Sequence, residues 1–192
     1  MSDFLMSCSC RGRRPKHVAS SATHSRPHLI ADLLRSRDVA RFLVAPTGFG
    51  KSTVAAEYAQ VVFSFRQTFW VNCESPCFLR DLDAGIIASR VAEIGGAGSL
   101  VVFDDLPRMD ALRVEVFSEV VDELLAAGSE VLVTCTPTCD AYSDLHRDRV
   151  KLSARRFLLT DDEMKHSVRA TDSPHAKCRA ACVAWGSDDG GR

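Results

Sequence analysis

The stretch RFLVAPTGFGKSTVAAEYAQ, residues 41–60, decides the fold. A short apolar run (41–44) leads into a turn with two glycines, and Lys51, Ser52 and an apolar pattern of helical period follow. This order is typical of a phosphate-binding loop, G-x-x-x-x-G-K-[ST], except that Ala45 stands where the pattern has its first glycine. Whether the loop is intact depends on what its other residues provide.

A loop of this kind binds phosphate through its main chain, a helix and two side chains. Main-chain N–H groups must converge on the anion, and Gly48 and Gly50 supply the conformational freedom that this tight turn requires. A helix must begin at the loop so that its unpaired N–H groups face the phosphates, and the predicted helix starts near Lys51. Lys51 and Ser52 provide the required lysine and hydroxyl. Ala45 lies upstream of the tight part, so we expect the loop to be intact.

A second motif follows further along the chain. LVVFDD, residues 100–105, is typical of a buried strand that ends in two carboxylates. In a P-loop fold we expect Asp104 to belong to the coordination shell of Mg²⁺, and Asp105 to polarise a water molecule for attack on the γ-phosphate. The alternative is a solvated strand end that precedes a turn at Pro107. The two motifs together favour a nucleotide-binding domain.

The order of the predicted elements indicates the fold class. Apolar runs predict strands at 41–44, 68–72, 99–105, 130–136 and 148–152. Helical periodicity predicts helices at 28–37, from Lys51 onward, at 79–94 and at 111–128. The apolar faces predicted for two of these helices are Val54, Tyr58, Val61 and Val62, and Leu112, Val116, Val120 and Leu124. This alternation predicts an α/β protein, a P-loop NTPase three-layer fold with a mostly parallel sheet flanked by helices.

The predicted domain organisation has three parts. Residues 1–24 are polar and basic without a period, which predicts a disordered arm, and 25–160 form the nucleotide-binding domain. Residues 161–192 lose the apolar period, which predicts the truncated start of a helical region and an irregular tail. We expect no direct nucleic-acid binding by this chain, because no helix-turn-helix pattern is visible.

Composition excludes several classes of protein. Of the 192 residues 46% are hydrophobic and 26% charged, as in a soluble globular protein, and the net charge of −1 gives no general attraction to nucleic acid or anionic membrane. No apolar stretch approaches the roughly 20 residues that span a bilayer, and no secretory signal is visible, so we expect a cytoplasmic protein without membrane contact. The eight cysteines are interpreted as small apolar residues, with a metal site or disulfides as open alternatives.

The segment RPHLIADLLRSRDVARFLVAPTGFGKSTVAAEYA (26–59) resembles the nucleotide-binding domains of the large ATP-binding LuxR-type transcriptional regulators. These are signal-transduction ATPases with numerous domains (STAND), of the maltose-activator kind. The family typically has Arg-Pro-x-Leu, a short helix, a strand and then A-P-A-G-[YF]-G-K-[ST], which residues 26–29 and 45–52 follow closely. The resemblance continues more weakly to about residue 165. In this family alanine is usual at position 45, which implies an intact loop.

The resemblance implies an ATP-binding switch with ATP and Mg²⁺ as ligands, and it implies that Arg26 and Pro27 border the adenine. Taken together, the predicted nucleotide-binding residues are Ala45, Pro46, Thr47, Gly48, Phe49, Gly50, Lys51, Ser52, Thr53, Arg26 and Pro27. The predicted catalytic residues are Asp105 and Lys51, and the predicted metal ligands are Ser52 and Asp104.

The sequence departs from the family in two respects. The fourth strand ends in Thr134-Cys135-Thr136 where the family usually has T-S-R, so the arginine that senses the γ-phosphate is missing, and we expect slow or marginal hydrolysis. The family's further domains are also missing, which implies protein partners or absent C-terminal domains. Two alternatives stay open: a non-catalytic truncated remnant, or a small-molecule P-loop kinase whose lid arginines are Arg147, Arg149, Arg155 and Arg156.

Overall fold

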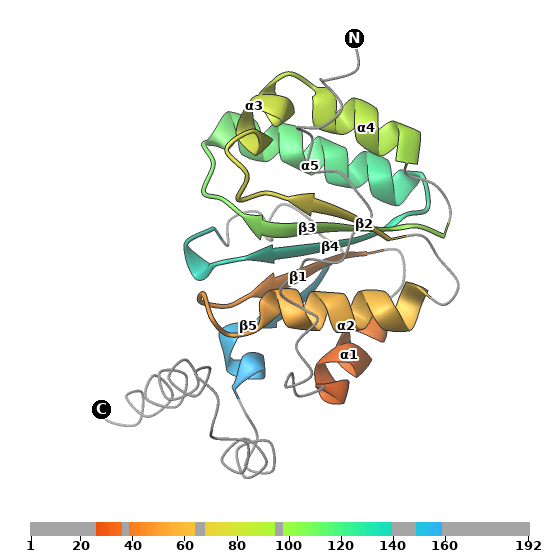
Figure 1. The fold of residues 1–192 in the computed structure, drawn as a ribbon, viewed down its shortest axis with the longest axis vertical. Coiled ribbons are helices and arrows are strands. Elements are labelled where there is room, and N and C mark those ends of the chain that lie inside the picture. Colours follow the sequence, from red (N-terminus) through yellow and green to blue (C-terminus); the bar gives the residue numbers. More distant parts are fainter. Residues whose placement is uncertain (1–25, 36–38, 64–67, 95–97, 140–148, 159–192) are drawn as a thin grey trace.

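The computed structural model describes residues 26–35, 39–63, 68–94, 98–139 and 149–158. Within these ranges strands and helices alternate along the chain (Figure 1). Their order is α1 (Pro27–Leu34), β1 (Ala40–Val44), α2 (Lys51–Phe63), β2 (Thr68–Asn72), α3 (Phe78–Asp83), α4 (Ile86–Ile94), β3 (Leu100–Leu106), α5 (Ala111–Ala126), β4 (Glu130–Cys135), β5 (Arg149–Ser153) and the 3₁₀ helix η4 (Ala154–Phe157). The predicted arm (1–24) and tail (161–192) lie outside the described residues.

The strands form one parallel sheet in the order β2-β3-β4-β1-β5. Every residue of β1 and β4 is buried, as expected for inner strands of a parallel sheet that is covered on both faces. In this order β4 separates β1 from β3, so the loop after β1 and the end of β3 lie on either side of β4. The carboxyl ends of such strands are where α/β sheets place their ligand sites.

Helices cover both faces of the sheet and make a three-layer structure (Figure 1). Alternate residues of β1 supply the two cores: Phe42 packs with the side chains of α3, α4 and α5, and Leu43 packs with those of α1, α2 and η4. On the first face, the rings of Phe103 and Phe117 meet edge to face with centroids 5.0 Å apart. The predicted α/β class, the parallel sheet and the flanking helices are confirmed.

Two helix predictions were wrong in detail. The region 79–94 is not one helix but two, because the chain turns at Gly85, whose φ of +67° is left-handed. Val61 and Leu112, both predicted on apolar faces, are 47% and 71% exposed. Helical period fixes the spacing of a face, but the neighbouring elements decide which part of that face is covered.

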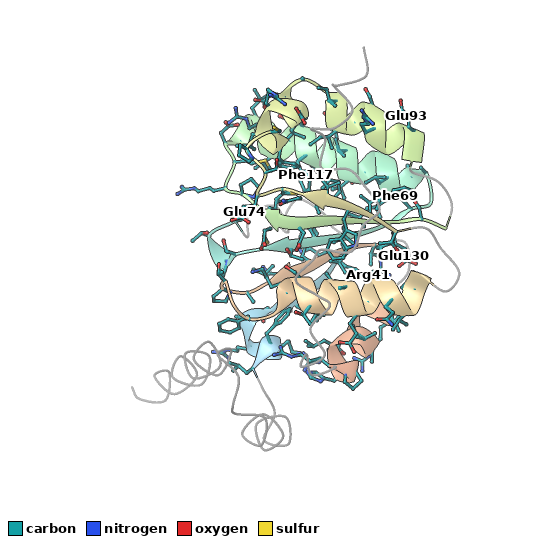
Figure 2. The ribbon with its side chains drawn as sticks, viewed as in Figure 1. Arg41, Phe69, Glu74, Glu93, Phe117 and Glu130 are labelled. Carbon is teal, nitrogen blue, oxygen red and sulfur yellow. The ribbon has the colours of Figure 1, made fainter. Side chains whose placement is uncertain are left out.

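A charged network is buried at the amino ends of β1 and β4 (Figure 2). Arg41 is only 1% exposed; its Nε donates to the Leu33 carbonyl at 2.9 Å, and it forms an ion pair with Glu130 at 3.5 Å. The guanidinium also lies over the Tyr58 ring, 5.4 Å from its centroid, and the Tyr58 hydroxyl donates to Glu130 at 2.6 Å. These contacts join α1, α2, β1 and β4 at the edge of the sheet opposite the phosphate-binding loop.

The beginning and the end of the described domain are joined. The Arg26 guanidinium donates to the Phe157 carbonyl at 2.9 Å, and its main-chain N–H donates to Glu57 on α2 at 3.1 Å. Arg156 pairs with Asp32 on α1. Among the described helices, none is long and apolar enough to cross a membrane.

Candidate nucleotide-binding site

The loop between β1 and α2 has the backbone that phosphate binding requires. Gly48 and Gly50 have φ values of +89° and +83°, which residues other than glycine rarely adopt. The helix begins directly after them: the Val54 N–H donates to the Gly50 carbonyl at 3.0 Å as the first helical bond. The unpaired N–H groups at the start of α2 therefore face the loop, where an anion is favoured.

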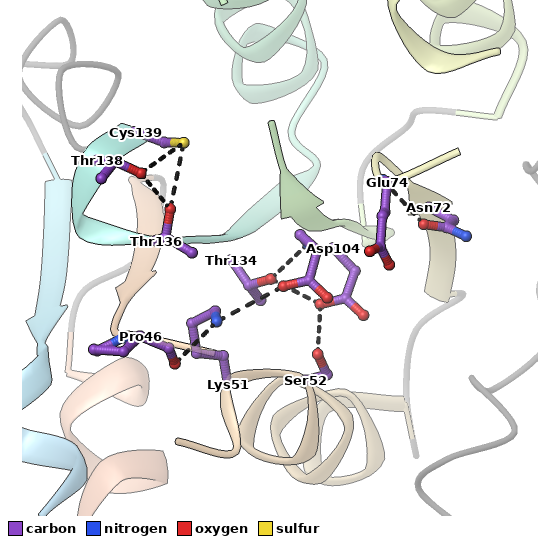
Figure 3. Close-up of polar contacts among 11 residues, drawn as sticks. Pro46, Lys51, Ser52, Asn72, Glu74, Asp104, Thr134, Thr136, Thr138 and Cys139 are labelled. Atoms are coloured by element: carbon purple, nitrogen blue, oxygen red, sulfur yellow. Dashed lines mark hydrogen bonds and ion pairs between the residues drawn. The ribbon is translucent and has the colours of Figure 1, made fainter. Parts of the chain in front are cut away.

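Lys51 is the first residue of α2, and its side chain is 4% exposed. Its ammonium lies 3.4 Å from the Pro46 carbonyl and 3.7 Å from Oδ1 of Asp105 (Figure 3). The lysine therefore connects the loop to the end of β3. A positive charge held between the loop and a carboxylate can meet phosphate oxygens with little reorganisation.

Ser52 and Asp104 are in direct contact. The Ser52 hydroxyl donates to Oδ1 of Asp104 at 2.9 Å (Figure 3). A hydroxyl and a carboxylate are the hard oxygen donors that Mg²⁺ takes from proteins, and it fills its other positions with water and substrate phosphates. The donor set of these two residues thus fits Mg²⁺.

The end of β3 is irregular at the second carboxylate. The β3–β4 register shifts between Phe103 and Leu106, and Asp105 has a φ of +55°, the only left-handed value at a non-glycine residue in the described part of the chain. The Asp105 main-chain N–H donates to the Thr134 hydroxyl at 2.8 Å. Bulges of this kind redirect a side chain at the end of a strand. Here the bulge places the Asp105 carboxylate beside Lys51.

Burial raises the pKa of the Asp104 carboxyl above its ordinary value, and the nearby charge of Asp105 acts in the same direction. The hydrogen bonds from Thr134 and Ser52 and the charge of Lys51 lower this pKa and so oppose the shift. A buried carboxylate that is costly to ionise by itself gains more from binding a cation than a solvated carboxylate does.

The structure brings some of the predicted site residues together and separates others. Lys51, Ser52, Asp104 and Asp105 lie together around the start of α2, and their roles stay predictions. Thr47 and Gly48 are exposed at the loop, Phe49 is buried, and Thr53 is half-buried on α2.

The other predicted nucleotide-binding residues lie at the margins. The Ala45 N–H donates to the Cys135 carbonyl at 3.2 Å, and the residue is fully buried. Ala45 therefore continues the sheet, and its methyl group packs in the core instead of entering the loop. The contacts that fix Arg26 are with Glu57 and Phe157, and Pro27 is exposed at the start of α1. The predicted roles of Arg26 and Pro27 at the adenine stay predictions.

Three polar residues near the site were not predicted. Thr134, near the carboxyl end of β4, contacts both aspartates, and its polarity after the apolar residues 131–133 was the available signal. Asn72 pairs with Asp104 in register across β2 and β3, and its side chain accepts the Glu74 N–H at 3.1 Å. Figure 3 shows Glu74 extending from this strand end, at the same edge of the sheet.

Some of the cysteines that were considered for a metal site, and some of the arginines of the predicted kinase lid, lie in the described part of the chain. Cys73, Cys135 and Cys139 are buried in the apolar cluster beside α3, α4 and α5. Within the described residues, no three His, Cys, Asp or Glu side chains are grouped to hold a metal ion. Cys8, Cys10, Cys178 and Cys182 lie outside the described residues, as does Arg147 of the predicted lid. Arg156 contacts α1 through Asp32, as a surface residue of the domain does.

No protein-family model matches this sequence. No curated protein matches it either. Among solved structures, a STAND protein with a tetratricopeptide repeat sensor from Pyrococcus horikoshii is 11% identical, with a TM-score of 0.49, over 84% of this chain and 28% of that one.

Two further solved structures are similar to this chain. The RuvB R170A variant of Thermotoga maritima is 17% identical over 75% of this chain and 48% of its own, with a TM-score of 0.43. Trip13 from Rhizobiales is 15% identical over 84% of this chain and 62% of its own, with a TM-score of 0.42. The chain thus spans less than two thirds of the length of each of these neighbours. What the site can do is decided by its own residues.

Proposed function

We propose that this chain is an ATP-binding P-loop module, the nucleotide switch core of a signal-transduction ATPase of the LuxR-type regulator kind. The observation that carries the proposal is the contact of Ser52 with Asp104 at the start of α2, beside the buried ammonium of Lys51. A cation site, a lysine and a helix N-terminus around one loop fit a nucleotide triphosphate and its Mg²⁺.

Each residue has a defined task in this proposal. The main-chain N–H groups from Gly48 to Ser52 and the Lys51 ammonium bind phosphate oxygens. Ser52 and Asp104 hold Mg²⁺, which would offset charge on the phosphates when bound. Asp105 accepts a hydrogen bond from the attacking water and orients it.

Slow turnover is part of the proposal. The carboxyl end of β4 presents Thr134, Cys135 and Thr136, so no guanidinium from this strand end neutralises charge that develops on the γ-phosphate. Contributions of such arginines to phosphoryl transfer reach about 10³- to 10⁵-fold. Binding is expected to persist without that group, which suits a switch whose state is set by the bound nucleotide. Assignment to the LuxR-type regulators, and to adenine over guanine, rests on the sequence resemblance.

Equilibrium binding of fluorescently labelled ATP tests the proposal. We expect Lys51→Ala to weaken binding by about 10- to 100-fold, because a charge-assisted contact is lost. Arg90→Ala is the matched control, because it removes one positive charge from α4 on the other face of the sheet. Equal affinity of the wild type and Lys51→Ala, or no binding by the wild type, would exclude the nucleotide site.

A coupled assay separates the switch from the kinase alternative. The switch hydrolyses ATP slowly with water as the only acceptor, whereas a kinase releases ADP only when a small-molecule acceptor is added. Acceleration by a metabolite panel, accompanied by a phosphorylated product, would favour the kinase.

A further inference from the structure

The hydroxyl of Thr134 connects the two aspartates of the site. Thr134 lies on β4, next to β3, and its side chain is completely buried. Its Oγ1 donates to Oδ1 of Asp104 at 2.7 Å and accepts the main-chain N–H of Asp105 at 2.8 Å (Figure 3). One hydroxyl therefore contacts the side chain of one carboxylate residue and the backbone of the next.

The second contact compensates for the bulge. A bulge puts two residues of one strand opposite one residue of its partner, which leaves an N–H without its ladder bond. The register shift after Phe103 creates this situation, and Thr134 Oγ1 takes the place of the missing carbonyl acceptor for Asp105. An unsatisfied buried N–H is costly, so the hydroxyl supports the left-handed backbone of Asp105.

The first contact fixes the metal-binding carboxylate. A threonine hydroxyl has one hydrogen, and because its oxygen already accepts the Asp105 N–H, that hydrogen is directed to Asp104. The Ser52 hydroxyl donates to the same Oδ1. Oδ2 of Asp104 accepts no hydrogen bond from the described residues, so one oxygen is anchored while the other stays available.

We propose that Thr134 is the positioning residue of this site, which orients Asp104 for Mg²⁺ and holds the bulge that places Asp105 beside Lys51. The inference rests on the proposed function. It assigns a role to the strand end that lacks the family's arginine: the β4 end acts here through a threonine that holds both carboxylates. Partners that orient metal ligands from outside the coordination shell commonly change metal affinity or activity by about 10- to 100-fold.

The test compares Thr134→Val, which keeps the shape but removes the hydroxyl, with Thr134→Ser, which keeps the hydroxyl. Thr138→Val is the matched control, because that exposed hydroxyl contacts Thr136 and Cys139 and neither aspartate. Labelled-ATP binding is measured over a Mg²⁺ titration and again with the metal chelated. We expect Thr134→Val to raise the Mg²⁺ requirement by about 10- to 100-fold, with binding in chelator unchanged. Thr134→Ser and Thr138→Val are expected to match the wild type.

A second readout needs neither metal nor nucleotide. Amide hydrogen exchange at Asp105 in the ligand-free protein is expected to be about tenfold faster in Thr134→Val, and to return to the wild-type rate in Thr134→Ser. An unchanged Mg²⁺ requirement in Thr134→Val, or a Thr134→Ser protein as impaired as Thr134→Val, would overturn the inference while ATP binding by the wild type still supported the proposed function.

If Thr134→Val does not fold, Thr134→Ala and the Asp104→Asn background decide. The Thr134→Ala, Asp104→Asn and double variants form a thermodynamic cycle in the ATP affinity measured with Mg²⁺. The loss of affinity that Thr134→Ala causes is expected to disappear in the Asp104→Asn background, because the metal contact is already lost there. A change of equal size in both backgrounds, or none in exchange at Asp105 when Thr134→Ala removes the hydroxyl, would contradict a role through Asp104 and Asp105.

Discussion

Ser52 and Asp104, which are 52 positions apart in the chain, lie in hydrogen-bond contact at 2.9 Å. The first is in the opening turn of α2 and the second is at the end of β3, and β4 lies between β3 and the strand that leads to α2. The topology of the sheet therefore assembles the candidate Mg²⁺ site without any contribution from the loop's tip.

We expect Ser52→Ala to raise the Mg²⁺ concentration required for ATP binding by at least about tenfold, because the variant lacks one candidate ligand and one bond to Asp104. Isothermal titration calorimetry with and without Mg²⁺ measures the effect. Ser89→Ala, which removes a hydroxyl that donates to the Gly85 carbonyl on the other face of the sheet, serves as control. Identical Mg²⁺ dependence in both variants would argue against the metal site.

Asp104→Asn is expected to stabilise the ligand-free protein at neutral pH while removing its Mg²⁺ response. The folded state raises the pKa of Asp104 above its ordinary 3.8, with burial as the main cause. Its favourable contribution to stability is therefore complete below the unfolded-state pKa and is lost as pH rises through the folded-state pKa. The asparagine side chain does not ionise, so the stability of the variant does not fall in this way as pH rises.

Thermal unfolding between pH 3 and pH 7 measures that difference. We expect the melting temperature of the wild type to fall relative to Asp104→Asn above pH 3.8, by about 2–4 °C for each kcal/mol of stability. Mg²⁺ with ATP should reverse the order, because it stabilises only the protein that binds it. Parallel pH curves for the two proteins would contradict the proposed cost of ionising Asp104.

Gly50→Ala is expected to abolish ATP binding through the backbone and not through crowding. An added Cβ would meet Thr53 only at 4.0 Å, which is an ordinary contact, but the φ of +83° costs an alanine about 1–2 kcal/mol. Gly85→Ala, at a φ of +67° and with nothing within 4 Å, imposes the same strain between α3 and α4. Urea unfolding should show similar losses for both variants, whereas labelled ATP should distinguish them. Loss of binding in both would point to global destabilisation.

Removing one member of the buried Arg41–Glu130 pair is expected to cost about 3–5 kcal/mol of unfolding free energy, because the other charge is left buried. Arg41→Met and Glu130→Met should together cost less than either alone, measured by urea denaturation. The control is Arg113→Ala, whose partners Asp83 and Asp110 are at the surface, and we expect a much smaller loss there. A loss at Arg41 as small as that at Arg113 would contradict this account.

Local sequence patterns predicted most of the helices and strands, and four of the predicted site residues lie together in the structure. The spacing of Gly50, Lys51 and Ser52 predicts where α2 begins, and the structure starts the helix at Lys51. The two aspartates after an apolar run predict a strand end near the loop, and the contact between Ser52 and Asp104 agrees with that. Such motifs can be recognised in a sequence because their residues keep a fixed spacing around a strand end and a helix start.

Contacts between residues far apart in the chain could not be predicted from local sequence patterns. Arg41 begins an apolar run, and its neighbours in sequence do not show that its guanidinium pairs with Glu130 and lies over the ring of Tyr58. Thr134 looked like the remnant of a family motif, since its two aspartate partners are 30 and 29 positions away. These roles depend on strand order and on the register shift in β3, which periodicity does not specify.

The buried Arg41–Glu130–Tyr58 network lies at the end of the sheet opposite the candidate site. These charged contacts lie at the amino ends of β1 and β4, and the candidate site lies at the carboxyl ends of the strands. A substitution at the carboxyl end of a strand therefore removes none of these charged contacts. Substitutions of Thr136 can therefore change the surroundings of the candidate site while they leave the charged contacts of Arg41 in place.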